Sequence, residues 1–180
     1  MTGYRRLFIP GGIHFFTLVI QERRPLLTEP GNMARLREGF RRVRAAHPFH
    51  IDALVILPDH LHAIWRLPDG DDDYALRWRK IKHYFSIGQD AATERASLER
   101  RREKGVWQRR FWEHAIRNEE DWRRHMDYVH YNPVKHGYVP SPGDWPHSSF
   151  ARAVERGLYS SDWGKEPPVT LAETEGEWGE

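Results

Sequence analysis

The chain contains no cysteine among its 180 residues. This absence excludes disulfide bonds, cysteine nucleophiles and thiolate metal ligands, so a metal site would need nitrogen and oxygen ligands. The sequence also lacks a run of about 18 apolar residues, which excludes a transmembrane helix. Its first residues are too polar for a signal peptide. We therefore expect a cytoplasmic protein with no membrane partner.

The charge balance is close to neutral, with 28 basic and 26 acidic residues and a net charge of +2. Arginine dominates the basic set, and the chain carries eight tryptophans, seven tyrosines and eight phenylalanines. Arginine together with exposed aromatic rings suits phosphate contact and base stacking. An arginine-rich surface around an aromatic core would have the same composition, so composition alone leaves nucleic-acid binding open.

Hydrophobic periodicity predicts seven elements of secondary structure. Strands are expected at residues 13–20, 51–57, 61–67 and 112–118, and helices at residues 32–47, 73–87 and 119–132. Asn32 is the expected N-cap of the first helix, Pro58 and Asp59 the expected turn between two strands, and Pro133 the expected end of the last helix.

The order of these elements predicts an α+β fold of the ferredoxin-like type, an antiparallel sheet with helices packed mainly on one face. The strands 51–57 and 61–67 form a hairpin, and we expect both to be central because they are nearly uninterrupted apolar runs. Residues 1–150 are expected to form this domain. Residues 151–180 are expected to be a tail, partly disordered because its end is acidic and contains adjacent prolines.

The segment "LPDHLHAIW" places His60 and His62 in the third predicted strand. Residues two apart in a strand point to the same face, about 7 Å apart, while Leu61 and Ala63 point to the other face. Two imidazoles could together bind one divalent cation of the Mg, Mn or Zn class. Two histidines do not complete a coordination shell, however, and a chain with eleven histidines can contain such a pair by chance.

The last predicted helix could supply the missing groups. Trp122, Met126 and Val129 repeat at helical spacing and define its buried stripe. Tyr128 and Asn132 lie one turn apart on a flank of that stripe, so a helix packed on the sheet could bring both close to the histidines. Asn132 could donate an amide oxygen to the cation. Tyr128 could equally be a boundary residue with its hydroxyl in water.

Three segments, "ILPDHLHAIW", "VWQRRFWEHAIRN" and "HMDYVHYNPVKHGYV", in this order and spacing resemble the REP-associated tyrosine transposases. The similarity extends from about Tyr4 to Asp144. These transposases belong to the HUH superfamily, named for its histidine–hydrophobic–histidine motif. The resemblance implies the ferredoxin-like fold. It also implies cleavage of single-stranded DNA beside short hairpins, the repetitive extragenic palindromes (REPs) of bacterial genomes, through a 5′-phosphotyrosine intermediate.

The resemblance also assigns roles to positions. It implies Tyr128 as the nucleophile, and His60, His62 and Asn132 as ligands of a divalent metal, Mg or Mn. His125 is a weaker candidate for the base that deprotonates the tyrosine.

DNA contacts are expected at six further residues. The resemblance favours Lys82, Trp107 and Gln108, and the indole of Trp107 could stack on a base. Arg5 and Arg6 in the N-terminal arm and Arg110 before the fourth strand are basic residues suited to phosphate contact. For these arginines a solvated surface role is an equally good explanation.

Together these features predict a metal-dependent single-stranded DNA endonuclease and strand transferase acting at REP-type hairpins. It would be nucleoid-associated and work as a monomer or a homodimer. One alternative is a hairpin-DNA-binding regulator that does not cleave, but such a protein would not need the intact Tyr128, His60 and His62. Another is a histidine phosphodiesterase of RNA, which needs a His-x-Ser/Thr motif in each half of the chain, and this sequence does not supply such a pair.

Overall fold

The structure, a computed structural model, describes residues 8–89 and 105–171 together with Trp178. Arg5 and Arg6, predicted to contact DNA, lie outside the described residues. No helix within the described ranges is long and apolar enough to cross a membrane.

Four antiparallel strands form one sheet, β1 (Ile13–Val19), β2 (His50–Ile56), β3 (His60–Arg66) and β4 (Trp112–Ala115). The main helices are α1 (Pro30–Ala46), α2 (Tyr74–Ser86), α4 (Glu119–Lys135) and the short α5 (Phe150–Glu155). Single 3-10 turns lie at Gln21–Arg23, Pro142–Asp144 and Val169–Leu171. This order of elements confirms the predicted α+β fold.

The strand order is β2-β3-β1-β4, so β1 and β3 are central and β2 lies at an edge. The prediction that both hairpin strands are central is therefore wrong for β2. Its apolar residues are nevertheless covered, because Ile51 and Ile56 pack into an apolar cluster on one face and Ala53 and Val55 into a cluster on the other. A later segment also pairs with the backbone of this edge. The Ile56 N–H donates to the His147 carbonyl and the Leu54 N–H to the Ser149 hydroxyl. A long apolar run in a strand therefore indicates that both faces of the strand are buried. It does not indicate whether the strand is central or at an edge.

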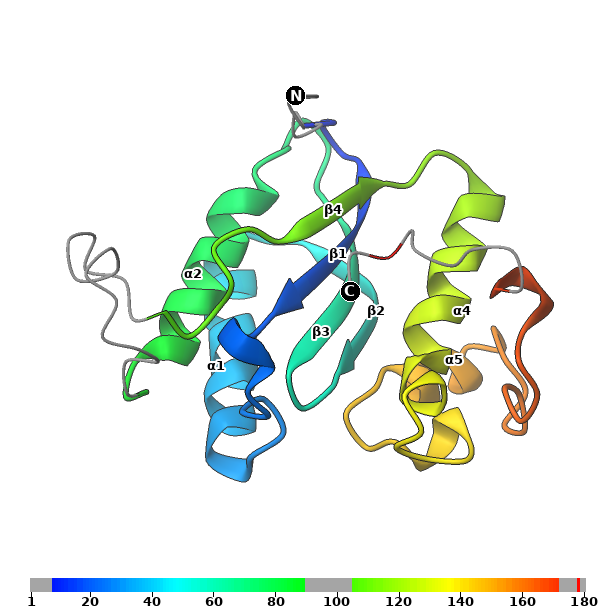
Figure 1. The fold of residues 1–180 in the computed structure, drawn as a ribbon. Helices are drawn as coiled ribbons and strands as arrows, with labels where there is room; N and C mark the ends of the chain where they lie inside the picture. The colour runs from blue at the N-terminus through cyan, green and yellow to red at the C-terminus, as the bar shows by residue number, and fades with distance from the viewer. Residues whose placement is uncertain (1–7, 90–104, 172–177, 179–180) are drawn as a thin grey trace, which may run out of the picture.

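Helices cover both faces of the sheet (Figure 1). α1 and α2 pack together on one face, where Leu61, Ala63 and Trp65 of β3 join the larger apolar cluster. α4 packs on the other face, where Met126 and Val129 join the second cluster. The alternation predicted for β3 is confirmed, and it leaves His60 and His62 on the α4 face.

Two predicted helix boundaries are wrong. α1 begins at Pro30, and Asn32 lies inside its first turn, where its side chain donates to the Leu26 carbonyl rather than capping the helix. α4 continues through Pro133 to Lys135. A proline in the last turn removes only one backbone hydrogen bond. The helix is closed by Gly137, whose positive φ of 71° suits a residue without a side chain.

The part of the C-terminal region that the structure describes packs against the domain. Phe150, at the predicted boundary, is the first residue of α5 and is buried. The Tyr159 hydroxyl donates to the Asp127 carboxylate on α4. Trp178 is only 5% exposed and belongs to the apolar cluster on the α4 face. Division of the chain at residue 150 stays a prediction.

Candidate active site

His60 and His62 lie at the start of β3, immediately after the turn that joins it to β2. Their ring centroids are 5.0 Å apart, and their exposed fractions are 1% and 0%. Two buried imidazoles side by side need polar partners, because an unsatisfied ring nitrogen in the interior is costly. Those partners decide which nitrogen of each ring is available to a cation.

A chain of hydrogen bonds fixes the tautomer of His62. The Thr17 hydroxyl donates its single proton to the Trp178 carbonyl at 2.6 Å. It must therefore accept from His62 Nδ1, which lies 2.8 Å away. The proton of the neutral imidazole thus sits on Nδ1, and Nε2 carries the lone pair.

Asp59 acts similarly on His60, whose Nδ1 lies 2.6 Å from the Asp59 carboxylate. Burial acts to raise the pKa of this carboxyl, but hydrogen bonds from His60 and Arg23 outweigh it and lower the pKa to about 2. An ionised carboxylate accepts from Nδ1–H and leaves Nε2 as the ligand atom. Both histidines therefore offer Nε2, the arrangement that a shared divalent cation needs.

Tyr128 of α4 lies against this pair. Its ring centroid is 5.1 Å from that of His62, and it is 1% exposed. The Lys135 ammonium donates to the Tyr128 hydroxyl at 3.2 Å and lies 4.8 Å from the ring centroid. A positive charge at this distance stabilises a phenolate more than a phenol. The predicted nucleophile and the predicted metal-binding histidines are thus brought together.

Asn132 is fully buried on α4, one turn after Tyr128. A buried amide at this point of the helix suits the predicted role as an oxygen ligand. The helix end contributes a third imidazole, because the His136 ring centroid is 5.1 Å from that of His60.

Trp178 covers the tyrosine. Its indole is stacked on the Tyr128 ring with centroids 4.0 Å apart and an interplanar angle of 8°. Its backbone carbonyl is the group that orients Thr17, and through Thr17 the His62 ring. One residue near the C-terminus therefore contacts the candidate nucleophile and, through Thr17, orients one candidate metal ligand.

The predicted base, His125, has other contacts. Its Nδ1 lies 2.8 Å from the Asp121 carbonyl, and its ring is packed against Phe15 and Trp178. Burial lowers the pKa of His125 to about 4. This environment keeps the ring neutral at pH 7 but gives it a basicity well below that of an ordinary histidine.

The predicted DNA contacts divide into two groups. Gln108 and Arg110 are exposed, and their DNA-binding role stays a prediction. Lys82 donates to the Gln108 carbonyl at 3.0 Å, which ties α2 to the loop before β4. Trp107 is 7% exposed and packs edge-on against Phe85 in the core. A ring buried in this way offers little surface to a base, and the DNA-binding role of Trp107 stays a prediction.

Five residues of this site were not singled out in the sequence, and His136, at the end of α4, is one of them. Asp59, Lys135 and His136 carry weak signals, since each lies within a motif already quoted, "PDHLH" or "YNPVKHG". Thr17 and Trp178 carry no signal in the sequence, because the hydrogen bond that joins them links positions 161 residues apart.

Comparison with known proteins decides the family. A protein of Escherichia coli K12 named REP-associated tyrosine transposase is 49% identical over 164 residues, which cover 91% of both chains. The chain belongs to the REP-associated tyrosine transposases. A Haemophilus influenzae Rd protein described as a candidate REP-associated tyrosine transposase is 42% identical over 174 residues, covering 95% of this chain and 98% of that one. No family model matches the chain.

A solved structure supports membership of the REP-associated tyrosine transposases. It is described as a REP-associated tyrosine transposase bound to a REP hairpin, and it is 44% identical in sequence. Its fold superposes with a TM-score of 0.81 over 100% of this chain and 98% of that chain. The family thus makes this protein a tyrosine transposase, with the α+β fold described above.

Proposed function

We propose that this transposase cuts and rejoins single-stranded DNA beside REP hairpins, with Tyr128 as nucleophile and a divalent cation, Mg or Mn, as cofactor. The observation that carries the proposal is the contact of the Tyr128 ring with His62, which joins α4 to the histidine pair of β3. The relative that was solved with a REP hairpin supports the choice of DNA.

The residues present fit a cation. His60 and His62 each present Nε2, because Asp59 and Thr17 hold their Nδ1 atoms, and Asn132 would add an amide oxygen. This set of nitrogen and oxygen donors suits Mn or Mg better than a soft metal ion. When bound, the cation would polarise the scissile phosphate and neutralise part of its charge.

The bonds that form and break belong to this chain's tyrosine and the DNA. Tyr128 loses its hydroxyl proton, and its oxygen attacks phosphorus while the bond from phosphorus to the 3′ oxygen breaks. The leaving strand takes up a proton as a 3′-hydroxyl, and the 5′-phosphate stays on the tyrosine. Lys135 stabilises the phenolate that attacks. Since one phosphoester replaces another, a second 3′-hydroxyl can reverse the reaction without ATP.

A REP hairpin with a single-stranded flank is the expected substrate, and a full duplex is not. Tyr128 and both histidines are buried on the sheet face under α4, so the phosphate must approach this face with its bases turned aside. Unpairing a duplex for this costs a few kcal/mol, whereas a single strand bends freely. The test compares the same end-labelled strand as a single strand, a hairpin with flank and a duplex, with Mn²⁺, on a denaturing gel. Equal or faster cutting of the duplex would contradict the proposal.

Replacing Trp178 with alanine is expected to accelerate adduct formation several-fold. Tyr128 is 1% exposed while the indole lies on its ring, so the indole must leave before a phosphate can reach the hydroxyl. Removing it eliminates the stacking energy, about 1 kcal/mol, that opposes this opening. Initial rates with hairpin DNA measure the effect. Trp163→Ala is the matched control, because Trp163 packs on Phe150 and Tyr159 instead. An unchanged or lower rate in Trp178→Ala would show that the indole does not restrict access.

A further inference from the structure

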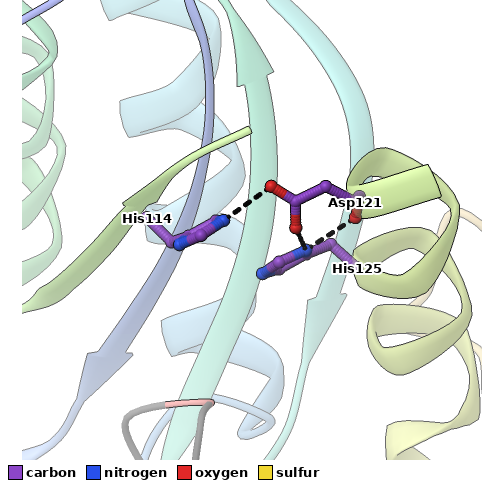
Figure 2. Close-up of side chains that lie close together, drawn as sticks. All are labelled: His114, Asp121 and His125. Carbon is purple, nitrogen blue, oxygen red and sulfur yellow. Dashed lines mark hydrogen bonds and ion pairs between the residues drawn. The ribbon is translucent and has the colours of Figure 1, made fainter. Parts of the chain in front are cut away.

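A second group of possible metal ligands lies beside the tyrosine helix. His114 comes from the edge strand β4, Asp121 from the first turn of α4, and His125 from the next turn (Figure 2). None of the three belongs to the His60 and His62 pair. The Phe15 ring separates the two groups, since its centroid is 5.5 Å from His62 and 4.8 Å from His125.

The three side chains converge on one point. Asp121 Oδ2 lies 2.8 Å from His114 Nε2, and Oδ1 lies 3.1 Å from His125 Nδ1. The two imidazoles are stacked with centroids 4.6 Å apart and nearly parallel, at 13°. One ligand atom from each residue lies within 4.8 Å of the others. Tetrahedral ligands about 2.1 Å from an ion are roughly 3.4 Å apart, so small side-chain rotations would complete the site.

The local backbone holds these groups in place. The Asn118 side chain caps α4 by accepting from the Asp121 N–H at 2.8 Å. The Arg117 N–H donates to the Asp121 carboxylate at 3.0 Å. Only three residues, 116–118, separate β4 from α4. Asp121 and His125 are four apart on the helix and therefore share one face.

We propose that His114, Asp121 and His125 bind a divalent cation of the zinc class, separate from the cation assigned to His60 and His62. Two imidazoles and one carboxylate are the ligand set of many three-residue sites for zinc and neighbouring transition metals. Thiolate ligands are excluded by the absence of cysteine.

The surroundings of the cluster suit a metal ion that also binds water molecules. The cluster lines a cavity of about 440 Å³, together with Trp112, Asn118 and Glu120 among others. This volume leaves room for water in the remaining coordination positions. Arg117 and Arg124 also line the cavity, so their charges offset those of Asp121 and Glu120. Affinity therefore depends on the coordinating bonds rather than on a general negative field.

Binding would replace existing hydrogen bonds. His125 Nδ1 donates to the Asp121 carbonyl at 2.8 Å, since a carbonyl oxygen can only accept, and His114 Nε2 lies 2.8 Å from the Asp121 carboxylate. The cation would take the place of the protons that now join these atoms. It would link the edge strand to α4 three residues before Tyr128, and so stabilise the position of the tyrosine helix.

The test uses full-length protein stripped with EDTA, in a His60→Ala/His62→Ala background that removes the other assigned site. Titration with ZnCl₂ by calorimetry, and with CoCl₂ by visible absorption, should give one equivalent bound, with the d–d bands of a nitrogen–oxygen site. Saturating zinc should raise the midpoint of thermal unfolding by about 5 °C or more. Because this background is expected to be inactive toward DNA, the result is independent of the proposed cleavage reaction.

His114→Gln in the same background should raise the zinc dissociation constant at least about ten-fold. Glutamine can still donate to Asp121, so the fold should persist, and circular dichroism checks this. Asp121→Asn should give the same result by removing the anionic ligand. His50→Gln is the control, because the exposed His50 also lies 2.8 Å from an aspartate, Asp52, and does not belong to the cluster. Absence of a bound equivalent in the background protein would overturn the proposal, as would unchanged affinity in His114→Gln. Either outcome would mean that His114, Asp121 and His125 only hydrogen-bond to one another and bind no metal ion.

Discussion

The Tyr128→Phe variant is expected to bind a REP hairpin with near-native affinity and to form no covalent adduct. Cleavage should fall by at least about 10³-fold, because no other group can replace the attacking oxygen. The phenyl ring keeps its packing on Trp178, His62 and Phe15, and the hydrogen bond from Lys135 is lost. That loss should cost about 1–3 kcal/mol of stability at most. DNA affinity depends on phosphate and base contacts rather than on this hydroxyl.

Denaturing gels of protein and labelled hairpin measure the adduct, and gel shifts under native conditions measure binding. Tyr131→Phe is the matched control, since Tyr131 is the next tyrosine on α4 and its ring lies near Trp163 rather than the histidines. Normal adduct yield in Tyr128→Phe would move the nucleophile to another residue, with Tyr131 tested first.

The faces on which the candidate site residues lie could be predicted from the periodicity of single strands and helices. Alternation along β3 placed His60 and His62 on one face opposite Leu61, because side chains in a strand point to alternate sides. Helical spacing of Met126 and Val129 fixed the buried side of α4, and so the side on which Tyr128 would lie. These arguments need only neighbouring residues, which explains why the element order and the faces on which these residues lie were predictable.

Long-range pairing was not predictable in the same way. The position of β2 at the sheet edge depends on which strands pair, and an apolar run does not encode this. Trp107 has an aromatic ring suited to base stacking, yet a β-bridge to Ile20 and contact with Phe85 draw it into the core. Trp178 lies far along the chain from Thr17 and Tyr128, and no periodicity connects them.

Replacing either His60 or His62 with alanine is expected to abolish cation-dependent cleavage. His60 Nδ1 is held by Asp59 and His62 Nδ1 by Thr17, and these hydrogen bonds leave each Nε2 to the proposed cation. Loss of one imidazole should raise the cation's dissociation constant by about 100-fold or more, since even changes outside the ligand set cost 10–100-fold. Excess Mn²⁺ should therefore restore part of the activity of a single variant and none of the double variant.

The main competing explanation is that these histidines only pack and hydrogen-bond in the interior. Alanine would then act through stability, by leaving Asp59 or Thr17 without its partner at a cost of about 1–3 kcal/mol. His130→Ala separates the two explanations, because His130 is 0% exposed and hydrogen-bonds Ser149, but lies outside the proposed ligand set. We expect it to lower the unfolding midpoint by a similar amount and to keep cation-dependent cleavage. Full activity of the native protein in EDTA would contradict the cation, and equal loss of cleavage in His130→Ala would favour the purely structural role.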